Sequence, residues 1–200
     1  MPRKRVDRVA ITMIGHASLL VQAAGQNILV DPVWSERASP VQFAGPKRVN
    51  PPGIEFDHLP PIDVVLITHT HYDHLDTNTI ARTWRRDRPR IIAALGTDVV
   101  IKRAAPGCEA DAGDWGDTFS IADRVSVTLH PANHWSARTL GDRRMALWCG
   151  FVIQADHEVI YLAGNTGYGD GRIFRQVRER VSVDPLSLFS RLEPTSRAGS

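Results

Sequence analysis

Four side chains that commonly bind metals lie in one short segment of the sequence. His69, His71, Asp73 and His74 follow residues 62–68, an apolar run typical of a strand buried on both faces. In an extended chain alternate side chains point the same way, so the imidazoles of His69 and His71 converge, while Asp73 and His74 can face a second point nearby. Imidazole with carboxylate suits zinc, with iron or manganese as alternatives, and the lack of thiolates disfavours a structural Cys-type site. The spacing predicts two adjacent metal sites.

The alternative interpretation is a polar turn that happens to be rich in histidine. It is disfavoured because burying three imidazoles without partners costs free energy. His58, His130 and His157 lie in no comparable motif, and we expect them to be structural.

The sequence around this segment predicts alternating strands and helices. Residues 9–20 and 27–30, on either side of Ala24-Gly25-Gln26, indicate a β-hairpin, and residues 31–61 indicate a long surface loop of the kind that often serves a site. Asp76 is a good N-cap for a helix over residues 77–86. The remaining expected elements are strands at 91–94, 118–121 and 124–130, helices at 97–104 and 171–180, and a hairpin of 145–154 with 158–163.

The composition is that of one folded domain. The chain has 200 residues, 42% hydrophobic and 23% charged, which excludes wholesale disorder, collagen and coiled coil. No apolar run could span a bilayer, and the N-terminus lacks a signal-peptide core, so we expect a cytoplasmic protein. The only cysteines, Cys108 and Cys149, are expected to be free thiols.

Positive charge is concentrated at the N-terminus. The net charge is +2, and Arg3, Lys4, Arg5 and Arg8 account for this excess, so the rest of the chain is nearly balanced. We expect residues 1–8 to be a disordered basic tail that contacts anionic lipid weakly at a membrane surface. Because basic residues and aromatics are not interleaved elsewhere, no nucleic-acid partner is expected.

These features appear in an order that resembles a known family. The matching stretches are Ile14-Gly15-His16-Ala17-Ser18, Val30-Asp31-Pro32, Ala38-Ser39-Pro40, Gly45-Pro46-Lys47-Arg48, Pro60-Pro61-Ile62-Asp63, the His69 to His74 motif, His134-Trp135-Ser136-Ala137-Arg138 and Ala163-Gly164-Asn165-Thr166-Gly167-Tyr168. Over residues 9–180 the chain resembles the metallo-β-lactamase superfamily, and in particular its N-acyl-phosphatidylethanolamine phospholipase D branch. The resemblance implies an α/β fold, a four-layer αββα sandwich.

The resemblance also implies roles for individual residues. His134 would be the third ligand of the metal held by His69 and His71, while Asp73 and His74 would serve a second metal. Asp73 would also help to orient the attacking water. His16 and Asp31 would lie beside the metals, His16 as a catalytic or pocket group and Asp31 behind the ligands. Three further residues would line the mouth of the substrate pocket: Trp135, Arg138 and Tyr168. The guanidinium of Arg138 would contact a phosphate of the substrate.

The chain departs from the family pattern in its second half. Asn165 stands where the family has an aspartate that bridges both metals, and an amide binds divalent metals more weakly than a carboxylate. The family's last ligand is a distant histidine, and none follows His157. We therefore expect one zinc site and a weakened second one. We also expect a C-terminally truncated sandwich that exposes the apolar inner face of its first sheet.

The last segment, residues 181–200, does not follow the family pattern. Codons can be chosen for these residues so that the same nucleotides, read two positions later, encode a sequence that resembles the family's next strand and loop. We therefore expect a frameshifted end whose residues are disordered.

The function implied is metal-dependent hydrolysis of a small-molecule or lipid phosphodiester. The alternatives are a lactonase, an RNA-directed phosphodiesterase or an inactive metal-binding remnant. The oligomeric state cannot be predicted from these features.

Overall fold

The computed structural model describes residues 2, 5–180, 186–188 and 191–193. Its first sheet has six strands in chain order, with β1 to β3 antiparallel and β3 to β6 parallel. The strands are β1 (Ala10–Gly15), β2 (Ser18–Ala23), β3 (Gln26–Val30), β4 (Val64–Ile67), β5 (Arg90–Ala94) and β6 (Asp111–Gly113).

A second sheet of five strands has the order β12-β10-β9-β8-β7 and is antiparallel except for the β10–β12 pair. Its strands are β7 (Thr118–Ala122), β8 (Val125–His130), β9 (Gly150–Ala155), β10 (Glu158–Leu162) and β12 (Leu186–Leu188). A separate parallel pair joins β11 (Asn165–Gly167) to β13 (Arg191–Glu193).

The two sheets pack face to face over a continuous apolar core. Leu66 and Ile28 from the first sheet and Phe151 and Val127 from the second are fully buried members of one cluster. The expected exposure of the first sheet's inner face is therefore wrong, because residues 118–162 already build a sheet that covers it.

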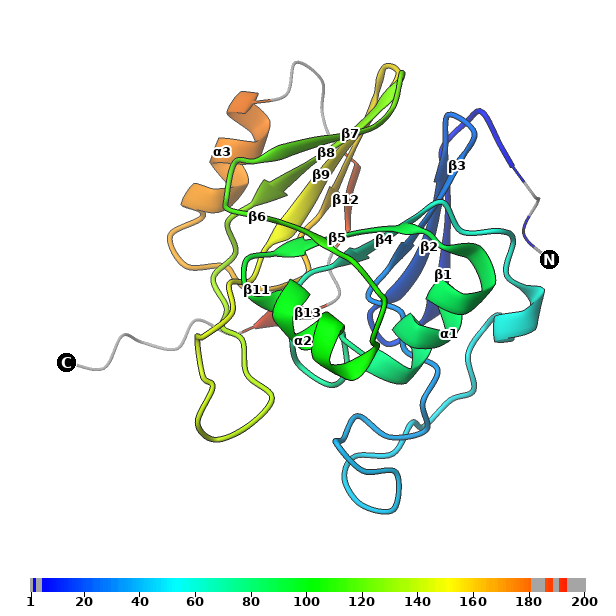
Figure 1. Cartoon of the computed structure of the whole chain (residues 1–200). Helices are drawn as coiled ribbons and strands as arrows, with labels where there is room; N and C mark the ends of the chain where they lie inside the picture. The colour runs from blue at the N-terminus through cyan, green and yellow to red at the C-terminus, as the bar shows by residue number, and fades with distance from the viewer. Residues whose placement is uncertain (1, 3–4, 181–185, 189–190, 194–200) are drawn as a thin grey trace.

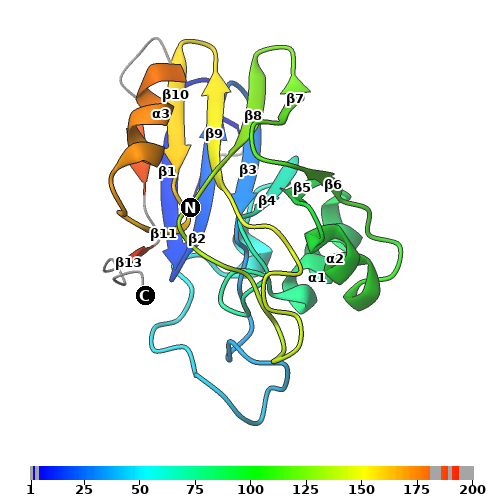
Figure 2. The same cartoon turned by 90° about the vertical axis from the view of Figure 1, so that its left-hand side faces the viewer.

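Helices cover the outer faces, as Figures 1 and 2 show: α1 and α2 lie on one side of the molecule and α3 on the other. Helices α1 (Thr77–Asp87) and α2 (Thr97–Ala104) bury Ile80 and Ile101 against the first sheet, beside the short 3-10 turn η1 (Phe56–His58). Helix α3 (Arg172–Arg180) buries Val177 against Tyr161 of the second sheet. The four layers confirm the expected αββα sandwich. Among the described residues no helix is both long and apolar enough to cross a bilayer.

Some of the observed strands differ from those expected, and the strand expected over 145–154 begins only at Gly150. The stretch 9–20 is two strands, because Gly15 and His16 turn the chain, with His16 at a left-handed φ of 46° and an irregular register between Met13 and Gly15. Strand β6 was not predicted, since its Asp-Ala-Gly sequence has no apolar alternation; it is held by the edge of β5.

Parts of the two ends that were expected from sequence to be disordered make defined contacts in the structure. In the N-terminal tail, Arg5 donates two hydrogen bonds to the carboxylate of Asp63, at 2.8 and 2.9 Å, and Gly25 N–H donates to the carbonyl of Val6. In the C-terminal segment, Leu186–Leu188 and Arg191–Glu193 are strands because β10 and β11 each offer a free edge for parallel pairing. The rest of the expected disorder lies outside the described residues.

The two cysteines are free and buried, Cys149 between the sheets and Cys108 beside α2, as expected. Burial raises the pKa of both thiols, most strongly at Cys149, where the charge of Asp31 adds to the effect. Because the thiolate is the reactive form, we expect both to react with an aromatic disulfide reagent at pH 8 at least about a hundredfold more slowly in the native protein than in guanidinium. Equal rates in the two states would contradict the buried placement.

Candidate metal centre

The metal-ligating segment begins where β4 ends and stops where α1 starts. Strand β4 lies between two parallel neighbours, and the chain leaves it at Ile67 to form a tight loop. Asp76 closes the loop because its carboxylate accepts hydrogen bonds from the N–H groups of Asn78 and Thr79 at the first turn of α1. This is the predicted N-cap. It fixes the end of the histidine-rich loop, residues 68–76, and the paired strand β4 fixes its start.

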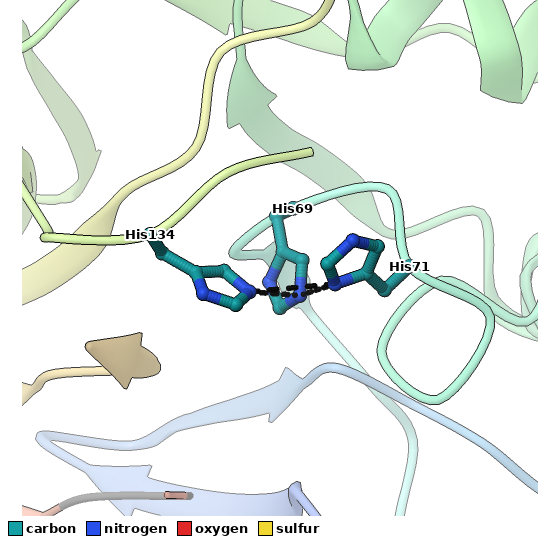
Figure 3. Close-up of side chains that lie close together, drawn as sticks. All are labelled: His69, His71 and His134. Atoms are coloured by element: carbon teal, nitrogen blue, oxygen red, sulfur yellow. Dashed lines mark hydrogen bonds between the residues drawn. The ribbon is translucent and has the colours of Figure 1, made fainter. Parts of the chain in front are cut away.

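Three imidazoles meet at this loop, as Figure 3 shows. Nε2 of His69 lies 2.9 Å from Nδ1 of His71, and Nε2 of His134 lies 3.2 and 3.3 Å from those two atoms. His134 comes from the chain after β8, so the second sheet supplies the third member of the group. The structure thus brings together the three residues that the sequence assigned to one metal.

The spacing of these nitrogens fits one metal ion. Ligand nitrogens around a tetrahedral zinc at ~2.0–2.1 Å are roughly 3.4 Å apart, close to the three distances here. Burial lowers the pKa of His69 well below its ordinary value, and the neighbouring imidazoles of His74, His134 and His71 lower it further. The neutral imidazole is the form that binds a metal, so the environment favours the ligating state.

A second group of ligands lies beside the first. One ligand atom each from His16, Asp73 and His74 lies within 4.8 Å of the others. Burial by itself would raise the pKa of Asp73, but the hydrogen bond with His16 and the charges of His74 and His16 outweigh it and hold that pKa well below its usual range. Asp73 is therefore a carboxylate at neutral pH. From the sequence, Asp73 and His74 were expected to serve one metal together, and His16 was expected beside them.

Asp31 connects the two ligand groups through hydrogen bonds to His74 and, by way of Thr68, to His69. Its Oδ2 accepts from the hydroxyl of Thr68 at 2.6 Å and from Nδ1–H of His74 at 2.7 Å. Since the Thr68 hydroxyl donates to Asp31, it accepts from Nδ1–H of His69 at 2.9 Å. This network assigns the proton to Nδ1 in both rings and leaves each Nε2 with a lone pair directed at its own ligand group.

The segment after His134 braces the histidine-rich loop. Ser136 Oγ accepts from the N–H of Thr70, and Arg138 donates to the carbonyls of Thr70 and Leu75 at 2.9 and 2.8 Å. The guanidinium also lies 3.9 Å from the centre of the Tyr72 ring. Arg138 was expected at the substrate mouth; here its side chain is committed to the loop backbone, a contact that sequence alone does not reveal.

Trp135, Tyr168 and Asn165, the other residues expected at the site, lie in three different environments. The Trp135 ring packs edge-on against His71, with ring centres 4.5 Å apart. Tyr168 is 54% exposed and stacks on Phe174 of α3. Asn165 is buried in β11, between Gly164, which packs against Thr68, and Thr166, which accepts from the N–H of Asn133.

A cavity of about 660 Å³ opens beside both ligand groups. His71, Tyr72 and Asp73 form one wall, His16 lies at the turn after β1, and the long loop supplies the rest. The loop residues at the cavity are Val33, Ser35, Glu36, Ala38, Pro46, Lys47, Arg48, Val49, Asn50 and Pro51. Within the described part of the chain, Trp135, Arg138 and Tyr168 are not in this lining. Lys47 and Arg48 were not among the expected site residues, and the signal that could have found them is their position in a long loop with a family motif.

Comparison with known proteins agrees with this fold. The family model described as a beta-lactamase superfamily domain matches residues 26–187. A metal-dependent hydrolase of Pyrococcus furiosus is 30% identical over 182 residues, 90% of this chain and 72% of its own length. An N-acyl-phosphatidylethanolamine-hydrolyzing phospholipase D of Caenorhabditis elegans is 32% identical over 185 residues, 88% of this chain and 51% of its own.

The chain is also similar to the solved structure of Igni18, a metallo hydrolase from Ignicoccus hospitalis, with a TM-score of 0.57 and 23% sequence identity. The match covers 80% of this chain and 61% of the Igni18 chain, and it supports the fold. The chain belongs to the metallo-β-lactamase superfamily of metal-dependent hydrolases. It spans about half the length of several curated relatives that it matches.

Proposed function

We propose that this chain is a metal-dependent phosphodiesterase whose metal ion is held by His69, His71 and His134. The observation that carries the proposal is the convergence of three ring nitrogens, each within 3.3 Å of the others, beside a cavity large enough for a small organic substrate. A metal ion bound there would supply Lewis-acid chemistry and lower the pKa of water. Zinc suits the three imidazoles best, and iron and manganese are the alternatives.

The cavity lining favours an anionic substrate with an apolar part. Lys47, 3.6 Å from the Glu36 carboxylate at the exposed edge of the cavity, is the positive charge that a phosphate could recruit. Arg48 adds positive charge while it donates to the carbonyl of Val33. The side chains of Val33, Ala38 and Val49 offer apolar contacts. The Asp73 carboxylate can accept a hydrogen bond from water and orient it toward phosphorus. In the reaction, the water oxygen forms a bond to phosphorus, the bond from phosphorus to the leaving oxygen breaks, and a proton ends on that oxygen.

A phospholipid is the first substrate to test. The C. elegans relative is named for hydrolysing N-acyl-phosphatidylethanolamine. In this chain Phe43 and Val49 are exposed apolar side chains on the loop that forms the cavity, and they would allow contact with a membrane surface. A cytoplasmic location with peripheral membrane contact is part of the proposal.

The experiment compares four substrates with zinc-loaded and chelator-treated protein. They are an activated phosphodiester, vesicles containing N-acyl-phosphatidylethanolamine, an acyl lactone and a structured RNA. We expect hydrolysis of the two diesters, lost with the chelator and restored by zinc. Turnover of the lactone alone or RNA alone would favour those alternatives. Absence of turnover on all four, with metal bound, would identify an inactive metal-binding protein.

A further inference from the structure

His16, at the turn between β1 and β2, faces the ligand group formed by Asp73 and His74. Its Nε2 lies 2.8 Å from Oδ2 of Asp73, and its ring centre lies 5.9 Å from that of His74. The side chain is 58% exposed and lines the cavity, so a metal ion can reach it from solvent. We propose that His16 is a metal ligand that completes a second, two-histidine one-carboxylate site with Asp73 and His74.

The first argument is the orientation of His74. Its side chain is fully buried, and its Nδ1 is committed to Asp31, so Nε2 carries the lone pair. That Nε2 makes no hydrogen bond within the described ranges, and it faces Oδ2 of Asp73 at 3.7 Å. Because a lone pair on Nε2 facing a carboxylate oxygen in a buried position is repulsive, a cation must lie between the two atoms, either a proton on Nε2 or a metal ion. The pair is therefore built to share a positive ion.

The backbone holds His16 in the left-handed region, with a φ of 46°, which few residues other than glycine adopt, although histidine is found there more often than most. Contacts hold the residues before and after it: Gly53 N–H donates to the carbonyl of Ile14 at 2.6 Å, Arg48 lies against Gly15, and the hydroxyl of Ser18 donates to the carbonyl of Asp31 at 2.6 Å. Unusual backbone conformations of this kind persist where the surrounding structure holds them, often at functional sites.

The second argument is the chemistry of the donor set. Two imidazoles and one carboxylate suit zinc, manganese and iron(II), and a set of three ligands leaves positions open for water or substrate. The inference shares the histidine-rich loop with the proposed function and extends it from one metal ion to two. It makes His16 a metal ligand where the sequence suggested a catalytic or pocket group.

The test is a cobalt(II) titration of metal-free protein, read by visible absorption and by metal content after desalting. Cobalt is the probe because its absorption bands and its hyperfine-shifted imidazole N–H signals report its ligands. We expect the wild-type chain to retain about two ions and His16→Gly about one, with the second ion bound at least about tenfold more weakly. Glycine keeps the positive φ and removes the imidazole, and His16→Asn is a second variant compatible with that backbone.

Two controls separate this inference from the proposed function. His157→Ala removes an exposed histidine outside both ligand groups and should retain two ions. The double variant His69→Ala, His71→Ala should retain one ion, at the second site, with the His16 signal present. If His16→Gly and His16→Asn keep both ions and every shifted imidazole signal, or if the wild-type chain never binds a second ion, the inference is wrong. Loss of one ion in His16→Gly supports it whether or not any substrate is hydrolysed.

Discussion

The double variant His69→Ala, His71→Ala is expected to lose metal-dependent phosphodiester hydrolysis by at least about a thousandfold, equivalent to about 4 kcal/mol of activation free energy. The reason is geometric, since two of the three converging nitrogens disappear and His134 alone cannot hold an ion. The measurement is kcat/KM on an activated phosphodiester at saturating zinc.

A matched control removes two other imidazoles. His58→Ala, His157→Ala changes exposed histidines outside both ligand groups and should keep the activity within about twofold, as expected for surface substitutions. If both double variants lose activity equally, the loss comes from general damage and not from the metal centre. If neither loses activity, hydrolysis occurs elsewhere.

Asp31→Ala is expected to destabilise the metal-free protein by about 3–5 kcal/mol. The buried carboxylate accepts from the backbone N–H of Thr68, from the Thr68 hydroxyl and from His74, and all three donors lose their acceptor. The measurement is urea unfolding of metal-free protein, with the slope of the transition compared to confirm a two-state process.

Asp156→Ala provides the matched control for this substitution. Asp31 and Asp156 both have a left-handed φ, 42° and 53°, so alanine causes similar backbone strain at each position. Asp156 pairs with Arg124 on the surface, and losing an exposed ion pair costs only about 0–1 kcal/mol. Equal destabilisation by the two variants would show that backbone strain at the left-handed position, and not loss of the buried network, causes the effect of Asp31→Ala.

The parts of the site that lie in one continuous segment could be predicted from sequence. The alternation of His69 and His71 after an apolar run, and Asp76 before a helix, are local patterns with local physical causes. The same holds for strands β4 and β10, whose apolar residues are buried in the structure.

The parts that depend on distant contacts could not be predicted. Arg138 has the charge of a phosphate-binding group. Only the fold shows that its guanidinium donates hydrogen bonds to the carbonyls of Thr70 and Leu75. The placement of His16 depends on a strained turn that no periodicity reveals. The cavity wall at Lys47 and Arg48 comes from a loop without periodic pattern, so its position depends on what it packs against.

The most direct test of the metal centre is diffraction from crystals of the zinc-loaded protein, collected above and below the zinc absorption edge. The account predicts an anomalous peak about 2.0–2.1 Å from Nε2 of His69, Nδ1 of His71 and Nε2 of His134. A map with no peak among these three nitrogens, at a zinc concentration that saturates the protein in solution, would contradict it.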